Sequence, residues 1–278
     1  MRTEQQQQQE YIFEAGVAEH TRLVEQATLF DPLTERLLVA AGVGPGMRVL
    51  DLGTGAGSVA LVAARLVGPE GSVVTVDRDP YALTLAAEHA EREGVRTIEF
   101  VEGDLAVPDL PGGLFDAVVS RFVLMYLPDP AATLHAAALR LRPGGVLCCH
   151  EPALHGAGAS PRGPLMARVQ TAIVTTFRLA GADPEMGLRL HRTIAEAGLP
   201  APEMQGETLL ACGPEAPVWG WGNLLRGMAP VMERLGVDGL AEARSATLDE
   251  RMLAELDESD GVVMGPLMVG AWTRVPAG

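Results

Sequence analysis

The feature that most constrains this chain is a glycine-rich turn between an apolar run and a helical pattern. The segment VLDLGTGAGS occupies residues 49–58, and a helix is predicted to begin at Ser58 and continue to residue 66. Glycines in such a turn let a ligand approach the backbone, and the N-terminus of the helix carries a partial positive charge. Because many nucleotide-binding folds share this arrangement, the turn predicts a binding site without identifying its ligand.

The turn belongs to a regular alternation of short apolar runs and helical patterns. Five strands are expected at 48–52, 72–76, 97–102, 115–120 and 146–150, with helices at 58–66, 81–93 and 131–141. A possible strand at 203–211 and a last strand within 262–275 would make seven. Strands separated by helices of this length form parallel sheets. We therefore predict an α/β fold of the Rossmann-like class, with a mostly parallel seven-stranded sheet and helices on both faces.

Helical segments flank this alternation. A first helix is predicted over 18–29, and a second begins at Asp31-Pro32, where Asp can cap a helix and Pro fits its first position. After residue 152 the pattern changes, and two mostly helical insertions are expected at 153–182 and 214–260, with a helix at 184–197 between them. The chain then divides into an N-terminal helical part (1–44), a binding core (45–152) and a part that completes the sheet (153–278).

The charge of the chain excludes several kinds of chemistry. The formal net charge is −15, and all 21 basic residues are Arg. Without Lys, the chain cannot form a lysine Schiff base, hold pyridoxal phosphate through lysine or build a P-loop lysine site. An acidic chain is also poorly suited to neutralise the phosphates of DNA or RNA. We therefore expect a small-molecule partner and no nucleic acid, and a homodimer stays open.

Neither a metal site nor a membrane segment is expected. Cys148, Cys149 and Cys212 lack metal-ligand spacing, and the adjacent pair lies in an apolar run, so we interpret all three as structural thiols. The first ten residues are polar, and no apolar window approaches the length of a membrane span. These features predict a cytoplasmic protein without a bound metal.

Carboxylates at three strand ends indicate the class of ligand. Asp77 lies twenty residues beyond Gly57, where it can accept hydrogen bonds from both ribose hydroxyls, and Asp104 follows the next strand at a place suited to an adenine edge. Asp51 lies two residues before the first glycine, where its charge would repel a pyrophosphate but favour a ligand with an ammonium and a sulfonium. This charge pattern favours S-adenosylmethionine over NAD.

Five motifs in order carry a family resemblance. VLDLGTGAG, VDRD, EGDL, FDAVVSRFVLMYLPDP and LRPGGVL resemble the ordered motifs of class I S-adenosylmethionine-dependent methyltransferases, over residues 45–152. The chain most resembles the small-molecule branch that includes ubiquinone/menaquinone and natural-product methyltransferases. The resemblance implies methyl transfer to an oxygen, nitrogen or carbon atom of a small, apolar metabolite, and the composition hints at secondary metabolism.

The resemblance also implies roles for individual residues. Gly53 and Gly55 would line the methionine part of the cofactor, and Arg121 would begin the loop over it. In similar enzymes the N-terminal helix is a lid, so an Arg there could pair with the methionine carboxylate. The expected cofactor-binding residues are Tyr11, Arg22, Gln26, Asp51, Gly53, Thr54, Gly55, Asp77, Arg78, Gly103, Asp104, Leu105 and Arg121. For Asp51 and Asp104, a hydrogen bond within the turn is the alternative.

The catalytic residues are less constrained. His150 and Glu151 end the fifth strand and His155 follows it, so each is a candidate general base for the acceptor. Many relatives carry His where this chain has Met125-Tyr126, and Tyr126 could either orient an acceptor or pack under the lid.

The insertions are expected to form the acceptor pocket and exclude water. Trp and Met side chains could line that pocket or form the core of the insertions, namely Trp219, Trp221, Met228, Met232, Met252, Met264 and Met268. Three alternatives to a methyltransferase stay open: an NAD-dependent oxidoreductase, an S-adenosylmethionine-binding enzyme with other chemistry such as a cyclisation, and a non-catalytic cofactor-binding protein.

Overall fold

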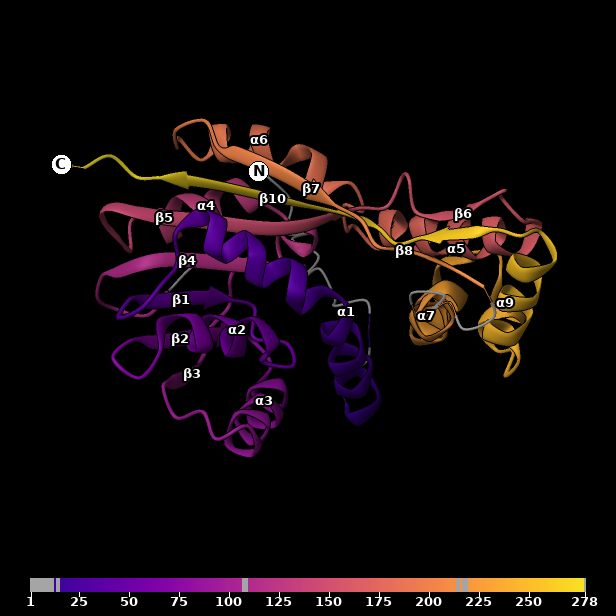
Figure 1. Cartoon of the computed structure of the whole chain (residues 1–278), viewed down its shortest axis with the longest axis horizontal. Coiled ribbons are helices and arrows are strands. Elements are labelled where there is room, and N and C mark those ends of the chain that lie inside the picture. Colours follow the sequence, from indigo (N-terminus) through magenta and orange to yellow (C-terminus); the bar gives the residue numbers. More distant parts are fainter. Residues whose placement is uncertain (1–12, 14–15, 107–109, 214–215, 217–219, 278) are drawn as a thin grey trace, which may run out of the picture.

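A seven-stranded sheet forms the centre of the protein. The computed structural model describes residues 13, 16–106, 110–213, 216 and 220–277. The sheet has the order β3-β2-β1-β4-β5-β10-β7, and β10 runs antiparallel to both of its neighbours (Figure 1). The pairs among β1 to β5 are parallel, which confirms the predicted mostly parallel sheet of seven strands. Its strands are β1 (Arg48–Leu52), β2 (Ser72–Asp77), β3 (Ile98–Glu102), β4 (Phe115–Arg121), β5 (Leu141–Ala153), β7 (Glu203–Glu207) and β10 (Leu267–Arg274).

Helices cover both faces of this sheet because successive strand residues alternate between the faces. Val49 packs with α1 (Val17–Ala41) and α2 (Ser58–Val67), whereas its neighbour Leu50 packs in the opposite core, which includes side chains of α4 (Pro130–Ala138) and α6 (Met186–Glu196). The helix α3 (Pro80–Arg92) lies against β2 and β3 (Figure 1). Both faces are therefore buried, as parallel sheets require.

The N-terminal region differs from the prediction of two helices. It forms one continuous helix, α1, with Pro32 inside it and Gly42 at its C-terminal end in the left-handed conformation, with φ +87°. Phe30, Leu33 and Leu37 are all buried along this helix. Tertiary burial on both sides of Pro32 outweighs the hydrogen bond that proline cannot donate. Asp31 is therefore not a helix cap.

The insertions form a second lobe that is not purely helical. Its helices α5 (Pro164–Leu179), α7 (Trp221–Leu235), α8 (Leu240–Ala243) and α9 (Leu248–Glu258) accompany a small antiparallel sheet of β6 (Gly158–Ser160), β9 (Val262–Met264) and β8 (Leu210–Cys212). The predicted strand at 203–211 is therefore divided between two sheets, with β7 in the central sheet and β8 in the small one. Strands of three residues are too short for an alternation pattern to reveal them.

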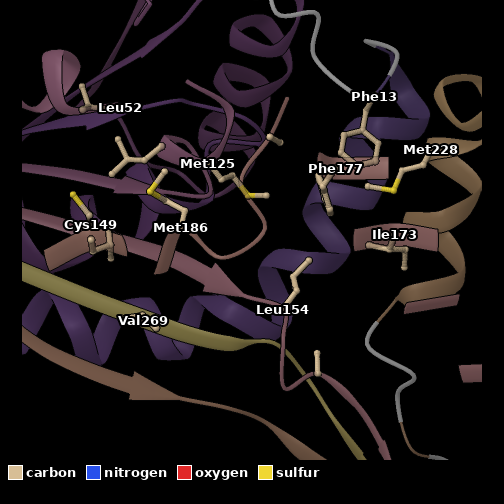
Figure 2. Close-up of a cluster of buried hydrophobic side chains, with 14 of the residues drawn as sticks. Phe13, Leu52, Met125, Cys149, Leu154, Ile173, Phe177, Met186, Met228 and Val269 are labelled. Carbon is tan, nitrogen blue, oxygen red and sulfur yellow. The ribbon is translucent and has the colours of Figure 1, made fainter. Parts of the chain in front are cut away.

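One hydrophobic core joins the lobe to the sheet. It runs from sheet residues such as Leu52 and Cys149 to Ile173 of α5 and Met228 of α7 (Figure 2). Cys148 and Cys149 are buried, whereas Cys212 is exposed. Among the described helices, none combines the length and apolar character needed to cross a bilayer.

Candidate functional site

A cavity of about 1410 Å³ lies at the carboxyl ends of the parallel strands and extends to the second lobe. Ligand pockets are typically about 300–1,000 Å³, so this cavity has room for a cofactor and a second molecule. Residues at or just after the ends of β1, β2, β3 and β4 line one end of it. These include most of the predicted cofactor set: Gly53, Thr54, Gly55, Asp77, Arg78, Gly103, Asp104, Leu105 and Arg121.

The glycine turn has the backbone that the sequence predicts. Gly53 has φ +81° and Gly55 has φ +49°, both in the left-handed region that favours glycine. A Cβ atom at Gly53 would lie 2.4 Å from Cγ2 of Val123, so the turn packs closely against the loop after β4. At Gly55 the nearest atom to such a Cβ is Cδ1 of Leu23 at 3.7 Å, so the backbone there stands open beside α1.

Two of the three predicted carboxylates face the cavity. The Asp77 carboxylate accepts hydrogen bonds from the backbone N–H of Gly55 at 3.1 Å and of Asp79 at 3.1 Å, which fixes it at the glycine turn. Asp104 is exposed and accepts from the N–H of Ala106 at 2.9 Å. Both residues line the cavity and retain lone pairs for a ligand.

The third carboxylate, Asp51, lies behind the glycine turn. It is fully buried, and its Oδ2 accepts a hydrogen bond from the Thr75 hydroxyl at 2.8 Å. The same Thr75 hydroxyl lies 2.8 Å from the hydroxyl of Thr54. Burial raises the Asp51 pKa to about 7, with the hydrogen bond from Thr75 acting in the opposite direction. Asp51 does not line the cavity. This arrangement supports the alternative interpretation, in which Asp51 stabilises the glycine turn from behind.

Arg121 joins three elements at the mouth of the glycine turn. Its Nη1 lies 2.9 Å from Asp31 Oδ1 and donates to the Thr34 hydroxyl at 2.7 Å, while Nη2 donates to Ser58 at 2.6 Å. The guanidinium is therefore held by α1 and by the start of α2. His150 lies in the same network, with Nδ1 3.1 Å from the Thr34 hydroxyl.

The N-terminal half of α1 borders the cavity, as a lid would. Arg22 and Gln26 both line it, and Tyr11 lies outside the described residues. The guanidinium of Arg22 contacts both carboxylate oxygens of Glu19, at 2.7 and 2.6 Å, and lies 4.3 Å over the ring of Phe13. Glu19 therefore neutralises Arg22, a partner that the sequence did not point to.

The predicted bases do not line the cavity. His150 is buried, and burial followed by the charge of Arg121 lowers its pKa to about 3, so its ring is neutral. Glu151 is fully buried and accepts at one oxygen from the backbone N–H groups of Val123 and Leu124. His155 is exposed on the loop beyond β5.

Tyr126 does line the cavity. It belongs to the 3-10 turn η1 (Leu124–Tyr126), and its ring centroid lies 6.2 Å from that of Phe177. Burial raises the pKa of its hydroxyl far above the usual value, so the group stays protonated. It is thus suited to donate a hydrogen bond rather than to remove a proton.

Apolar side chains from the lobe form the other end of the cavity. Figure 2 shows Phe13, Phe177 and Met228 gathered on one side of the core. Of these, Phe13 and Phe177 line the cavity together with Leu154, Trp221 and Leu224. Phe177 lies in the insertion predicted to be mostly helical, but the sequence could not separate a cavity wall from a core, since both are apolar.

Of the two positions expected for the methionines, cavity wall or core, the structure supports the core for most of them. None of Met228, Met232, Met252, Met264 and Met268 lines the cavity, and all except Met264 are fully buried in the protein core. Met125 takes the position by the cavity instead. Trp219 lies outside the described residues.

Comparison with known proteins identifies relatives that match part of this chain. Nocamycin O-methyltransferase from Saccharothrix syringae is 41% identical over 117 residues, which cover 42% of this chain and 41% of that protein. Aklanonic acid methyltransferase from Streptomyces sp. (strain C5) is 33% identical over 132 residues, 48% of this chain and 60% of that protein. The chain thus spans less than two thirds of the length of these relatives.

The fold extends beyond that sequence match. The structure of the YcgJ protein from Bacillus subtilis has a TM-score of 0.58 and 17% identity to this chain, and the match covers 88% of this chain and 99% of that protein. At this identity the likeness concerns the fold alone.

The residues at the sheet end of the cavity fit S-adenosylmethionine. The open backbone at Gly55 accommodates a ligand against the turn, and the carboxylates of Asp77 and Asp104 suit a cationic nucleoside. Residues 44–198 match the family model described as a methyltransferase domain. Because this match spans more than half of the chain, the protein belongs to the methyltransferase-domain family, with S-adenosylmethionine as its cofactor.

Proposed function

We propose that the protein transfers a methyl group from S-adenosylmethionine to an oxygen, nitrogen or carbon atom of a small, apolar molecule. The observation that carries this proposal is the division of one cavity into two ends of different chemistry. Carboxylates and open glycine backbone lie at the sheet end, and aromatic and aliphatic side chains lie at the lobe end. When bound, the cofactor supplies an electrophilic methyl group on a sulfonium.

The sheet end would hold the cofactor. Asp77 would accept hydrogen bonds from the ribose, Asp104 and Leu105 would flank the adenine, and the turn at Gly53 and Gly55 would contact the methionine part. Arg121 would brace this end through the contact of its guanidinium with Ser58.

The lobe end favours an uncharged acceptor larger than an ion. Phe13, Phe177 and Leu224 are apolar, and the nearby cation Arg22 is already paired with Glu19. Trp221 is buried and also lines the cavity, so its indole ring adds to the apolar wall. A thiophilic metalloid is disfavoured, since Cys148 and Cys149 are buried in the sheet away from the cavity.

Catalysis would rest on positioning. Holding two reactants in near-attack geometry can contribute roughly 7–11 kcal/mol. His150, Glu151 and His155 do not line the cavity, and Tyr126 keeps its proton. An acidic acceptor such as a phenol or enol needs no strong protein base, so we expect acceptors of that class.

The net charge of the chain indicates which class of partner it binds. The net charge of −15 supports a small-molecule substrate rather than a nucleic acid. A cytoplasmic location and a homodimer stay predictions.

Calorimetric titration tests the cofactor site directly. We expect the purified protein to bind S-adenosylmethionine and S-adenosylhomocysteine but not NAD. Asp77→Ala should weaken both adenosyl ligands by about 10- to 100-fold, the loss expected for hydrogen bonds to a charged group. Asp238→Ala is the matched control, because Asp238 is exposed and lies outside the cavity.

Turnover is tested next, with cofactor labelled on the methyl group and a panel of phenolic and enolic acceptors. Label in the acceptor supports the proposal. Binding of NAD, or no binding of either adenosyl ligand, would contradict it.

A further inference from the structure

Glu151 occupies an unusual position for an acidic side chain. It lies near the end of β5, has no exposed surface and does not line the cavity. Its Oε1 accepts hydrogen bonds from the backbone N–H groups of Val123 and Leu124, each at 2.9 Å. These two amides begin the turn η1, where helical hydrogen bonding cannot satisfy them.

The burial of this carboxylate is costly. Its Oε2 has no hydrogen-bond partner among the described residues, and buried polar atoms without partners are rare in proteins. The titratable groups that face it are Asp183, Tyr126 and Cys149, and none of them is a cation. Because no cation faces this carboxylate, its hydrogen bonds to the backbone are the main interactions that offset the cost of its burial.

The turn that Glu151 holds lies between the two ends of the cavity. At one side, Val123 packs against Gly53, where a Cβ would lie 2.4 Å from its Cγ2. At the other side, Tyr126 lines the cavity beside Phe177. The turn is also fixed by the segment before α6, because the carbonyl of Met125 accepts from the N–H of Asp183 at 2.8 Å.

We propose that Glu151 is a positioning residue whose carboxylate oxygen fixes turn η1, and thereby aligns the cofactor turn at Gly53 with the acceptor wall at Tyr126. This role rests on the proposed function of the cavity. It differs from that of a general base, because Glu151 acts through Val123 and Leu124 and contacts neither reactant.

The first test compares two substitutions by calorimetric binding of S-adenosylhomocysteine. Glu151→Ala removes the acceptor oxygen and should weaken binding by about tenfold, because the freed amides are left unpaired. Glu151→Gln keeps a carbonyl oxygen at the same place and should restore affinity to within about threefold of wild type. Glu185→Gln is the control, because Glu185 also has a buried oxygen without a partner among the described residues, whereas the amides at the start of η1 donate to Glu151.

Two results would overturn the proposal. One is Glu151→Ala binding the ligand as tightly as wild type, and the other is an equal loss in both Glu151 variants, which would assign the effect to charge or packing instead of the acceptor oxygen.

A second measurement uses the wild-type protein and needs neither a variant nor a ligand. Amide hydrogen exchange, followed by NMR, should be as slow at Val123 and Leu124 as at Val118 in the middle of β4. Fast exchange at these two amides would refute the positioning role. If wild type failed to bind S-adenosylhomocysteine, the proposed function would fall, and the exchange rates would still decide the role of Glu151.

Discussion

The Nη1 atom of Arg121 lies 2.9 Å from Oδ1 of Asp31, so a partly buried ion pair joins the end of β4 to the middle of α1. The Arg121 side chain is 5% exposed and that of Asp31 is 25% exposed. The same guanidinium also contacts Thr34 and Ser58, so one cation holds the N-terminal helix on the glycine turn.

Removal of Asp31 should therefore destabilise the whole protein. Asp31→Ala leaves a buried guanidinium without its countercharge, and we expect the free energy of unfolding to fall by about 2–3 kcal/mol. Urea denaturation provides the measurement. Glu196→Ala breaks the exposed pair with Arg192 and should leave the free energy of unfolding almost unchanged. Equal losses of stability in the two variants would show that the pair between Arg121 and Asp31 contributes no more than an exposed ion pair.

Glu151 should make stability depend on pH. Burial raises its pKa to about 7 from an ordinary 4.5, so its contribution to stability is fully present below pH 4.5 and is lost as pH rises through 7. His150 acts in the opposite sense, because burial lowers its pKa to about 3 from 6.5, so stability is lost as pH falls from 6.5 towards 3.

A comparison with Glu151→Gln isolates the first effect, since His150 is common to both proteins. Relative to wild type, the variant should gain up to roughly 3 kcal/mol between pH 5 and pH 8. Denaturation at four pH values checks this. A pH-independent difference between the two proteins would mean that Glu151 does not titrate in this range.

Gly53→Ala should disturb both the turn and ligand binding. Gly53 has φ +81°, and the added Cβ would meet Val123 at 2.4 Å. Gly236→Ala is the control, since Gly236 has φ +67° in the left-handed region but open space around its Cβ position. Both variants pay the left-handed strain of about 1–2 kcal/mol, so the excess loss at Gly53 reports the clash. Denaturation and S-adenosylhomocysteine titration should both show that excess loss. Similar losses in the two variants would mean that the turn lies farther from Val123 than the structure shows.

Glu255 stabilises the lobe by capping α5 from a distant helix. Its carboxylate accepts from the backbone N–H groups of Leu165 at 2.9 Å and Met166 at 3.0 Å. Glu255→Ala should lower the free energy of unfolding by about 1–2 kcal/mol, as the loss of a helix cap does. Glu258→Ala, at an exposed position of the same helix, should have little effect. If Glu255→Ala were as stable as wild type, the cap would not contribute to the stability of the lobe.

Local signals predicted most of the cofactor end. Asp79 caps α3 by accepting from the N–H of Tyr81 at 2.9 Å, and Pro80 occupies the first turn, close to the predicted start at 81. The glycine turn and Asp77 could be placed because a parallel strand ends where the next connection begins, so strand ends share one edge of the sheet.

The catalytic candidates could not be placed in this way. His150 and Glu151 were chosen for their position at a strand end, yet His150 faces Thr34 of α1 and Glu151 faces the amides of η1. The position of a residue along a strand predicts at which edge of the sheet it lies, but not which group its side chain contacts. Such partners come from segments far away in the sequence, as the separation of His150 from Thr34 by 116 residues illustrates.

The positions of the central strands along the chain, the glycine turn and the acidic strand ends could thus be predicted from the sequence, because these features depend on neighbouring residues and on periodicity. The sheet order, the continuation of α1 through Pro32, the division of β7 and β8 between two sheets, and the cavity wall shared by Phe13, Phe177 and Trp221 required the folded structure. The physical reason is that burial and hydrogen-bond satisfaction depend on contacts between remote segments, and these contacts outweigh local preferences of about 1–3 kcal/mol for single residues.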